Sequence, residues 1–253
     1  MIDAHLHLGE DLIFDGVDTT EEKILEEMDR CGLEGAVIYP ANSNVSLEAE
    51  RERNERVAAF CRQYPERIYG ICQLNPNYGR EMYQAEVEKY KEKGLLGISV
   101  NPQVYGWDPR SHHGQIVFET AARLELPLFI AVGVGLPLGQ PLRLYDLCQA
   151  YPQVPVVLVH ADKSYCGHQC ETLAGECPNI YLETSLGPNM RLLKKYVDRY
   201  GADRVIMGSC TMTQVEHSIY MHEHCGITQE QKKWTMGKTI KKVLGIERGM
   251  EKC

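Results

Sequence analysis

The sequence lacks an excess of positive charge, a membrane-length apolar run and a secretory leader. Among 253 residues, 27 lysines and arginines stand against 35 acidic residues, so the formal net charge is −8. This balance argues against a general nucleic acid binder, which needs a basic face to displace counterions. No stretch approaches the roughly 20 apolar residues of a membrane helix. The opening Met1-Ile2-Asp3 has neither the basic nor the apolar region of an export signal. We therefore expect a cytoplasmic protein without a membrane or nucleic acid partner.

The ten cysteines are scattered singly through the chain, several of them inside apolar runs. A chain of this length buries enough apolar surface without disulfide bonds, so reduced thiols are the expected state. One group is denser and comprises His160, Cys166, His168, Cys170 and Cys177. Its spacing is not a standard zinc-finger pattern. The sequence favours a loop with incidental thiols, with a second, structural zinc as the alternative.

Short apolar runs alternate with helical patterns along the whole chain. Nearly continuous apolar runs are typical of strands buried on both faces, as in a parallel sheet. Eight such runs predict strands at Met1–His7, Ala36–Tyr39, Ile68–Leu74, Leu96–Val100, Leu128–Val132, Val156–His160, Ile180–Ser185 and Arg204–Gly208. Eight βα units in about 250 residues favour one α/β domain over residues 1–253, a closed (β/α)8 TIM barrel. An open doubly wound sheet is the competitor, but Leu8-Gly9-Glu10 is not its glycine-rich turn.

Helices are predicted between these strands. Thr19-Thr20-Glu21-Glu22 has the chemistry of a helix start and Cys31-Gly32 that of a helix end. Further helices are expected over Leu47–Gln63, Arg80–Lys93, Gly114–Leu124, Leu142–Ala150, Pro188–Tyr200 and Thr228–Val243, with a short one near Gln169–Gly175.

The first predicted strand ends in Asp3-Ala4-His5-Leu6-His7. Residues two apart on a strand point to the same side, so His5 and His7 can direct both imidazoles to one point. The carboxyl ends of barrel strands carry the active site. Two neutral imidazoles converging there suit a divalent transition metal, and zinc is the default.

Ile2-Asp3-Ala4-His5-Leu6-His7-Leu8-Gly9 resembles the opening of the amidohydrolase superfamily, in its amidohydrolase-related branch of metal-dependent TIM-barrel hydrolases and decarboxylases. Later segments are similar to further units of that branch, among them Leu126-Pro127-Leu128-Phe129-Ile130, Val156-Val157-Leu158-Val159-His160, Tyr181-Leu182-Glu183-Thr184-Ser185 and Val205-Ile206-Met207-Gly208-Ser209. The resemblance implies a small-molecule substrate, a homodimer, and a metal bound by the strand-one histidines, a strand-five histidine and a strand-eight aspartate. It also implies that the strand-six histidine, His160, acts in catalysis.

Two positions depart from the branch. The strand-five histidine is replaced by Ala131, which cannot bind a metal, and the strand-eight aspartate by Cys210. A cysteine thiolate beside two imidazoles suits zinc, so His5, His7 and Cys210 are the expected ligands. His160 is either the catalytic histidine or a fourth ligand that closes the site.

The missing aspartate also removes the group that takes a proton in this branch. Asp162, two residues after His160, is the first candidate to replace it, ahead of Glu183, Glu10 and Asp11. Asn101 and Ser185 end strands and are candidates for substrate binding.

Three hypotheses follow. The leading one is a metal-dependent hydrolase or non-oxidative decarboxylase of a small carboxylate, lactone or amide. The second is a barrel that has lost catalysis, because of Ala131 and Cys210, and binds or senses a ligand. The third is redox sensing through Cys210.

Overall fold

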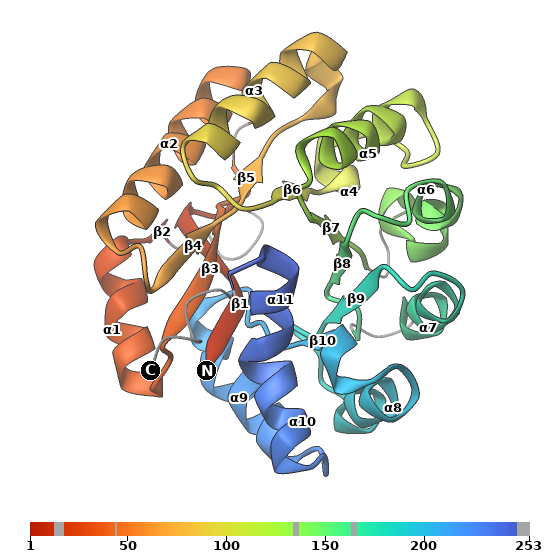
Figure 1. Cartoon of the computed structure of the whole chain (residues 1–253). Helices are drawn as coiled ribbons and strands as arrows, with labels where there is room; N and C mark the ends of the chain where they lie inside the picture. The colour runs from red at the N-terminus through yellow and green to blue at the C-terminus, as the bar shows by residue number, and fades with distance from the viewer. Residues whose placement is uncertain (13–17, 44, 134–136, 163–165, 247–253) are drawn as a thin grey trace.

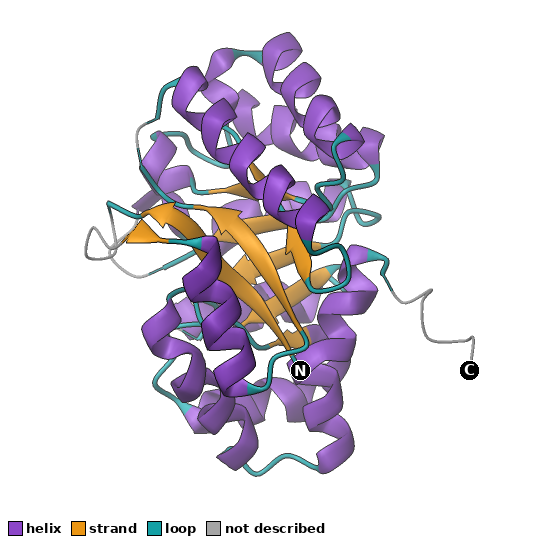
Figure 2. Cartoon of the chain, turned by 90° about the vertical axis from the view of Figure 1, so that its left-hand side faces the viewer, coloured by secondary structure: helices purple, strands orange, loops and turns teal. Residues whose placement is uncertain are grey.

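The structure is a computed structural model that describes residues 1–12, 18–43, 45–133, 137–162 and 166–246. Parallel strands lie at its centre and helices surround them (Figures 1 and 2). The strands are β1 (Ile2–Glu10), β3 (Gly35–Pro40), β4 (Ile68–Gly70), β5 (Cys72–Gln73), β6 (Ile98–Val100), β7 (Leu128–Ala131), β8 (Val156–Val159), β9 (Ile180–Glu183) and β10 (Val205–Ile206). A two-residue strand, β2 (Asp18–Thr19), pairs antiparallel with the end of β1.

The strands close into a ring. Hydrogen bonding orders them as β2-β1-β3-β4 in one sheet and β10-β9-β8-β7-β6-β5 in the other. Only Ile71 separates β4 from β5, and its amide donates to Ile38 O while the next amide, of Cys72, donates to Gly97 O. On the far side, Ala4 N donates to Met207 O over 3.0 Å. With β4 and β5 as one interrupted strand, the described residues form the predicted (β/α)8 barrel, and all eight predicted strands are confirmed.

The helices follow the strands around the outside of the ring (Figure 1). They are α1 (Glu21–Cys31), α2 (Leu47–Gln63), α3 (Arg80–Glu92), α4 (Pro102–Tyr105), α5 (His112–Leu124), α6 (Tyr145–Ala150), α7 (Gly167–Glu176), α8 (Met190–Tyr200), α9 (Val215–His224), α10 (Gln229–Lys233) and α11 (Thr239–Leu244). None of the helices in the described ranges combines the length and the apolar character needed to cross a bilayer.

The capping of α1 agrees with the sequence pattern. The Thr20 side chain accepts a hydrogen bond from Lys23 N, and Gly32 ends the helix in the left-handed conformation at φ 66°.

The final helical segment differs from the prediction of one helix over Thr228–Val243. A π-helical turn at Trp234–Lys238 separates α10 from α11, because Met236 and Gly237 leave helical geometry. Helix α9 was not predicted at all.

The barrel interior is filled by inward-facing side chains of the strands. Ile2, Val37, Phe129 and Val157 belong to one buried cluster with Ile240 of α11. A Cβ added at Gly237 would lie 3.9 Å from the backbone nitrogen of Ile2, at the start of β1. The last helical segment therefore closes the end of the barrel where the strands begin, and leaves the opposite end for polar side chains.

Candidate metal centre

The polar residues predicted for the site meet at the carboxyl ends of the strands. His5 and His7 lie on β1 and Glu183 ends β9. His160 directly follows β8, and Cys210 comes four residues after the end of β10. A parallel bridge between Leu6 and Cys210 places the thiol beside the two β1 histidines. The chain thus closes its barrel at the point where its first and last strands bring these side chains together.

His5 and His7 face each other through their Nε2 atoms, which are 3.0 Å apart. The opposite nitrogen of each ring already has a partner. His7 Nδ1 lies 3.1 Å from Pro40 O, and His5 Nδ1 lies 3.3 Å from Ser185 Oγ. A carbonyl oxygen can only accept, so His7 carries its proton on Nδ1 and directs the Nε2 lone pair toward His5.

The electrostatics favour neutral rings. Burial lowers the pKa of His5 well below its usual value, and the neighbouring His7 adds to this effect. Burial also lowers the pKa of His7, against the opposing influence of Asp11. Neutral imidazole is the form that binds a metal, and two lone pairs facing each other are stabilised by a shared cation.

Cys210 completes a set of three donors. The ligand atoms of His5, His7 and Cys210 all lie within 4.8 Å of one another. The backbone fixes the thiol, because Cys210 N donates to His5 O over 2.6 Å. Cys210 also has φ 71°, a strained conformation for a residue with a side chain. The donor set and its burial fit a zinc ion, with Cys210 in the place that the sequence analysis gave it.

His5, His160 and Glu183 form a second group whose potential ligand atoms lie within 4.8 Å. Hydrogen bonds account for this group without a metal. Ser185 Oγ lies 2.7 Å from His160 Nδ1 and 2.8 Å from Glu183 Oε2. The Glu183 carboxyl also accepts from the amides of His160 and Ser185. Ser185 is therefore buried between the side chains of His160 and Glu183 and hydrogen-bonded to both.

A further buried carboxyl anchors the segment that leads to Cys210. Asp3 accepts hydrogen bonds from the amides of His5 and Ser209 and from the Ser209 hydroxyl. Burial raises the pKa of Asp3 to about 7, although the Ser209 hydroxyl opposes the rise. The aspartate of the first-strand motif is thus a support for the backbone on both sides of the donor set.

Asp162 and Asn101 occupy different surroundings. Asp162 is buried, and neither carboxyl oxygen has a hydrogen-bond partner within the described residues. Burial raises the pKa of Asp162 well above its usual range, and the charge of Glu183 adds to it. Asn101 caps α4, because its side chain accepts from Val104 N over 3.3 Å.

Tyr39 is a site residue that the sequence analysis missed. Its ring centroid lies 4.3 Å from that of His5, and its hydroxyl has no hydrogen-bond partner in the described part of the chain. Burial and the charge of Glu183 raise the pKa of Tyr39 well above its usual value. The residue ends the apolar run Ala36–Tyr39, which predicts a strand and no chemical role, so only the barrel geometry reveals it.

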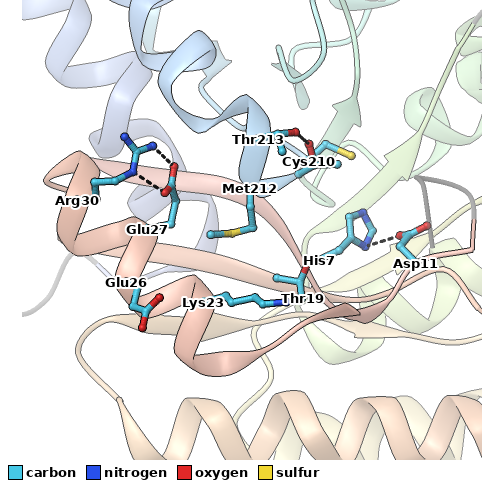
Figure 3. Close-up of a pocket in the computed structure, with 11 residues that line it drawn as sticks. His7, Asp11, Thr19, Lys23, Glu26, Glu27, Arg30, Cys210, Met212 and Thr213 are labelled. Carbon is cyan, nitrogen blue, oxygen red and sulfur yellow. Dashed lines mark hydrogen bonds and ion pairs between the residues drawn. The ribbon is translucent and has the colours of Figure 1, made fainter. Parts of the chain in front are cut away.

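A groove of about 380 Å³ opens from His7 and Cys210 toward α1. Figure 3 shows His7 and Asp11 at one end and Arg30 and Glu27 of α1 at the other, with Met212 and Lys23 between them. Asp11 Oδ2 lies 3.5 Å from His7 Nδ1 and accepts from both nitrogens of Asn42.

The groove carries both charge signs. Arg30 is paired with Glu27 and Glu216. The Lys23 ammonium contacts only the backbone oxygen of Asp18 among the described residues. Lys23 is therefore the cation with donors to spare for a ligand.

The cysteine and histidine group after β8 does not form a second zinc site within the described residues. Cys166 and Cys170 are buried, whereas the His168 side chain is 91% exposed and pairs with Glu171. All nine cysteines in the described ranges are free, as predicted for reduced thiols.

The barrel and its candidate donor set are typical of a metal-dependent enzyme of the TIM-barrel type. The chain belongs to the Amidohydrolase family, whose model matches residues 2–246. No curated protein sequence matches the chain.

Solved structures share the fold at low sequence identity. The 5-carboxyvanillate decarboxylase LigW from Sphingomonas paucimobilis is 15% identical, with 97% of this chain and 98% of that chain covered and a TM-score of 0.78. The 2,6-dihydroxybenzoate decarboxylase from Rhizobium is 14% identical, with 97% and 98% covered and a TM-score of 0.78. A dihydroxybenzoic acid decarboxylase from Polaromonas sp. JS666, solved with bound manganese, is 18% identical, with 97% and 96% covered and a TM-score of 0.77.

Proposed function

We propose that this protein is a metal-dependent decarboxylase or hydrolase of a small carboxylate, lactone or amide. The metal would be held by His5, His7 and Cys210. The observation that carries the proposal is the 3.0 Å approach of the two Nε2 atoms. It is strengthened because His7 Nδ1 and His5 Nδ1 each have another partner and Cys210 completes the group.

Zinc is the proposed metal. A thiolate with two imidazoles is a softer donor set than the oxygen-rich sets that manganese prefers. Bound zinc would polarise an oxygen of the substrate as a Lewis acid. Three protein donors also leave room for a substrate atom, as in catalytic zinc sites.

Decarboxylation is the better supported of the two reactions. Hydrolysis needs a base to take a proton, and Cys210 has replaced the aspartate implied by the family resemblance. Decarboxylation instead needs a proton delivered to the carbon that loses carbon dioxide. Burial raises the pKa of the Asp162 carboxyl well above its usual range and so favours its acid form. We therefore propose that Asp162 supplies this proton, with His160 passing it to substrate or contacting the departing carboxylate.

The groove beside His7 and Cys210 supports an anionic substrate. Its volume of about 380 Å³ is within the range of small-molecule sites. The Lys23 ammonium, which has only a carbonyl partner among the described residues, can donate to a carboxylate at the far end. We therefore place a small organic acid in the groove, with its reacting end at the donor set.

Elemental analysis of the purified protein tests the metal centre. Wild type is compared with His5→Ala and Cys210→Ala, and with Cys61→Ala as a control that removes a thiol on α2, outside the donor set. We expect about one zinc per chain in wild type and Cys61→Ala, and little in the other two. Equal zinc in all four proteins would refute the assigned ligands.

Activity is then measured on a panel of small carboxylic acids, lactones and amides, with released carbon dioxide and acid as separate readouts. Loss of turnover on chelation and its return with zinc are expected. Full activity after exhaustive chelation would overturn the proposal. Stoichiometric zinc without turnover on any compound would favour the alternative that Ala131 points to, a barrel that binds a ligand without converting it.

A further inference from the structure

We propose that Glu183 and Ser185 are positioning residues, and that the single Ser185 hydroxyl sets the tautomers of His5 and His160 together. In this arrangement both rings carry their proton on Nδ1 and direct an unprotonated Nε2 into the barrel mouth. The inference rests on the proposed function only in assigning those Nε2 atoms to metal and substrate.

The Glu183 carboxyl determines the direction of the hydrogen bonds. Oε1 accepts from Ser185 N over 2.8 Å. Oε2 accepts from His160 N over 2.9 Å and from Ser185 Oγ over 2.8 Å. Three donors converge on this one buried group, and two of them are backbone amides, which can only donate. The hydrogen of the Ser185 hydroxyl is therefore directed to Glu183.

A serine hydroxyl has one hydrogen and two lone pairs. With its hydrogen committed to Glu183, Ser185 Oγ can only accept from other neighbours. Those neighbours are His160 Nδ1 at 2.7 Å and His5 Nδ1 at 3.3 Å. Each ring must donate from Nδ1 to satisfy the contact, so each Nε2 is left unprotonated.

The packing gives this network little freedom to rearrange. Glu183 and Ser185 are fully buried. Gly208 leaves the space that Glu183 fills, since a Cβ there would lie 2.2 Å from Glu183 Oε1. His160 has φ 66°, a strained backbone conformation, and its backbone N–H donates a hydrogen bond to the same carboxyl.

Because one oxygen serves both rings, the two halves of the site are coupled. His5 belongs to the proposed metal ligands and His160 to the proposed proton path. Hydrogen-bond partners of ligating histidines fix ring orientation, and losing one typically weakens metal affinity about 10–100-fold. Removal of the Ser185 hydroxyl by one substitution should therefore both weaken metal binding and change the tautomer of His160.

The test is a long-range ¹H–¹⁵N correlation spectrum of histidine-labelled, zinc-loaded protein, which distinguishes the two imidazole tautomers. In wild type we expect His5 and His160 to be protonated at Nδ1. In Ser185→Ala, the spectrum of His160 should no longer show the Nδ1-protonated tautomer alone. The zinc dissociation constant should rise about 10–100-fold. His7 is the internal control, because Pro40 O holds its Nδ1 independently of Ser185.

Ser218→Ala removes another buried serine, on α9, and is expected to leave both readouts unchanged. Protonation of His160 at Nε2 in the wild-type protein would overturn the inference without any variant. So would an unchanged His160 tautomer together with unchanged zinc affinity in Ser185→Ala. A protein without zinc would refute the proposed metal centre, whereas the tautomer of His160 would still decide the role of Ser185.

Discussion

Replacement of Gly208 by alanine should be strongly destabilising, although glycine to alanine is a small change. A Cβ at this position would lie 2.2 Å from Glu183 Oε1 and 2.9 Å from His5 Cβ. Since ordinary contacts begin near 3.4 Å, the carboxyl would have to move by about 1 Å. Such a movement breaks the 2.8 Å bond from Ser185 N and disturbs the 2.9 Å bond from His160 N.

The magnitude follows from these two effects. Overpacking of a filled core costs about 1–3 kcal/mol. A hydrogen bond to a charged group contributes about 1.5–3 kcal/mol. We therefore expect Gly208→Ala to lower the free energy of unfolding by roughly 3–5 kcal/mol, and to weaken zinc binding through the displaced His5.

Urea denaturation measures this change, with Gly175→Ala as the matched control. Gly175 lies in α7 with no atom within 4 Å of the added Cβ. Alanine should stabilise that helix by about 0.5–1 kcal/mol. The two variants are thus expected to shift the midpoint in opposite directions. A Gly208→Ala protein within 0.5 kcal/mol of wild type would refute the assigned packing of Glu183.

Three further outcomes are expected. Cys210→Ser should lower zinc affinity and leave the folding of the metal-free protein little changed, because oxygen replaces the soft thiolate; equal zinc binding by competition with a chelating dye would contradict this. Lys23→Met should raise KM for a carboxylate substrate several-fold with kcat little changed, whereas Lys194→Met, on α8, should do neither; an equal effect of both variants would remove the assigned role of Lys23. Burial raises the pKa of Glu50 from about 4.5 to about 7, so wild type should lose up to about 3 kcal/mol relative to Glu50→Gln as the pH rises from 4.5 through 7. Urea midpoints at pH 5 and pH 8 measure that loss, and parallel pH profiles of the two proteins would refute it.

The barrel was predictable because its signals are local and repeated. Each apolar run required only its own residues, and the period of two on β1 was enough to predict that His5 and His7 converge. Helix α9 was missed because the stretch Val215–His224 has no strong apolar stripe; it alternates histidine, glutamate and apolar residues. The break at Trp234–Lys238 lies where Met236 and Gly237 leave helical geometry, in a turn that contacts β1, and local propensity does not encode it.

The support of the site was less predictable than its donors. Glu183 was considered only as a lesser candidate for a base, because its sequence position gives no hint of the three donors around it. The strand-end position of Ser185 predicts a contact with substrate, but it gives no hint that the hydroxyl lies between two imidazoles and a carboxyl. Tyr39 was hidden in an apolar run. These roles depend on strands far apart in the sequence, and such contacts become visible only once the barrel is closed.

The place where the barrel closes has a consequence for folding. β1 and the segment after β10 are joined by the amides of Ala4 and Cys210 and by a single bridge at Leu6. The proposed ligands lie across this seam, two on its first side and one on its last. A bound ion would then link β1 to the segment after β10 and hold the barrel closed. Opening of the seam would be linked to metal release, and the ion would stabilise the closed ring by RT ln(1 + [M]/Kd). Docking of the segment after β10 onto β1, which closes the ring, would thus also be the step that brings the proposed ligands together.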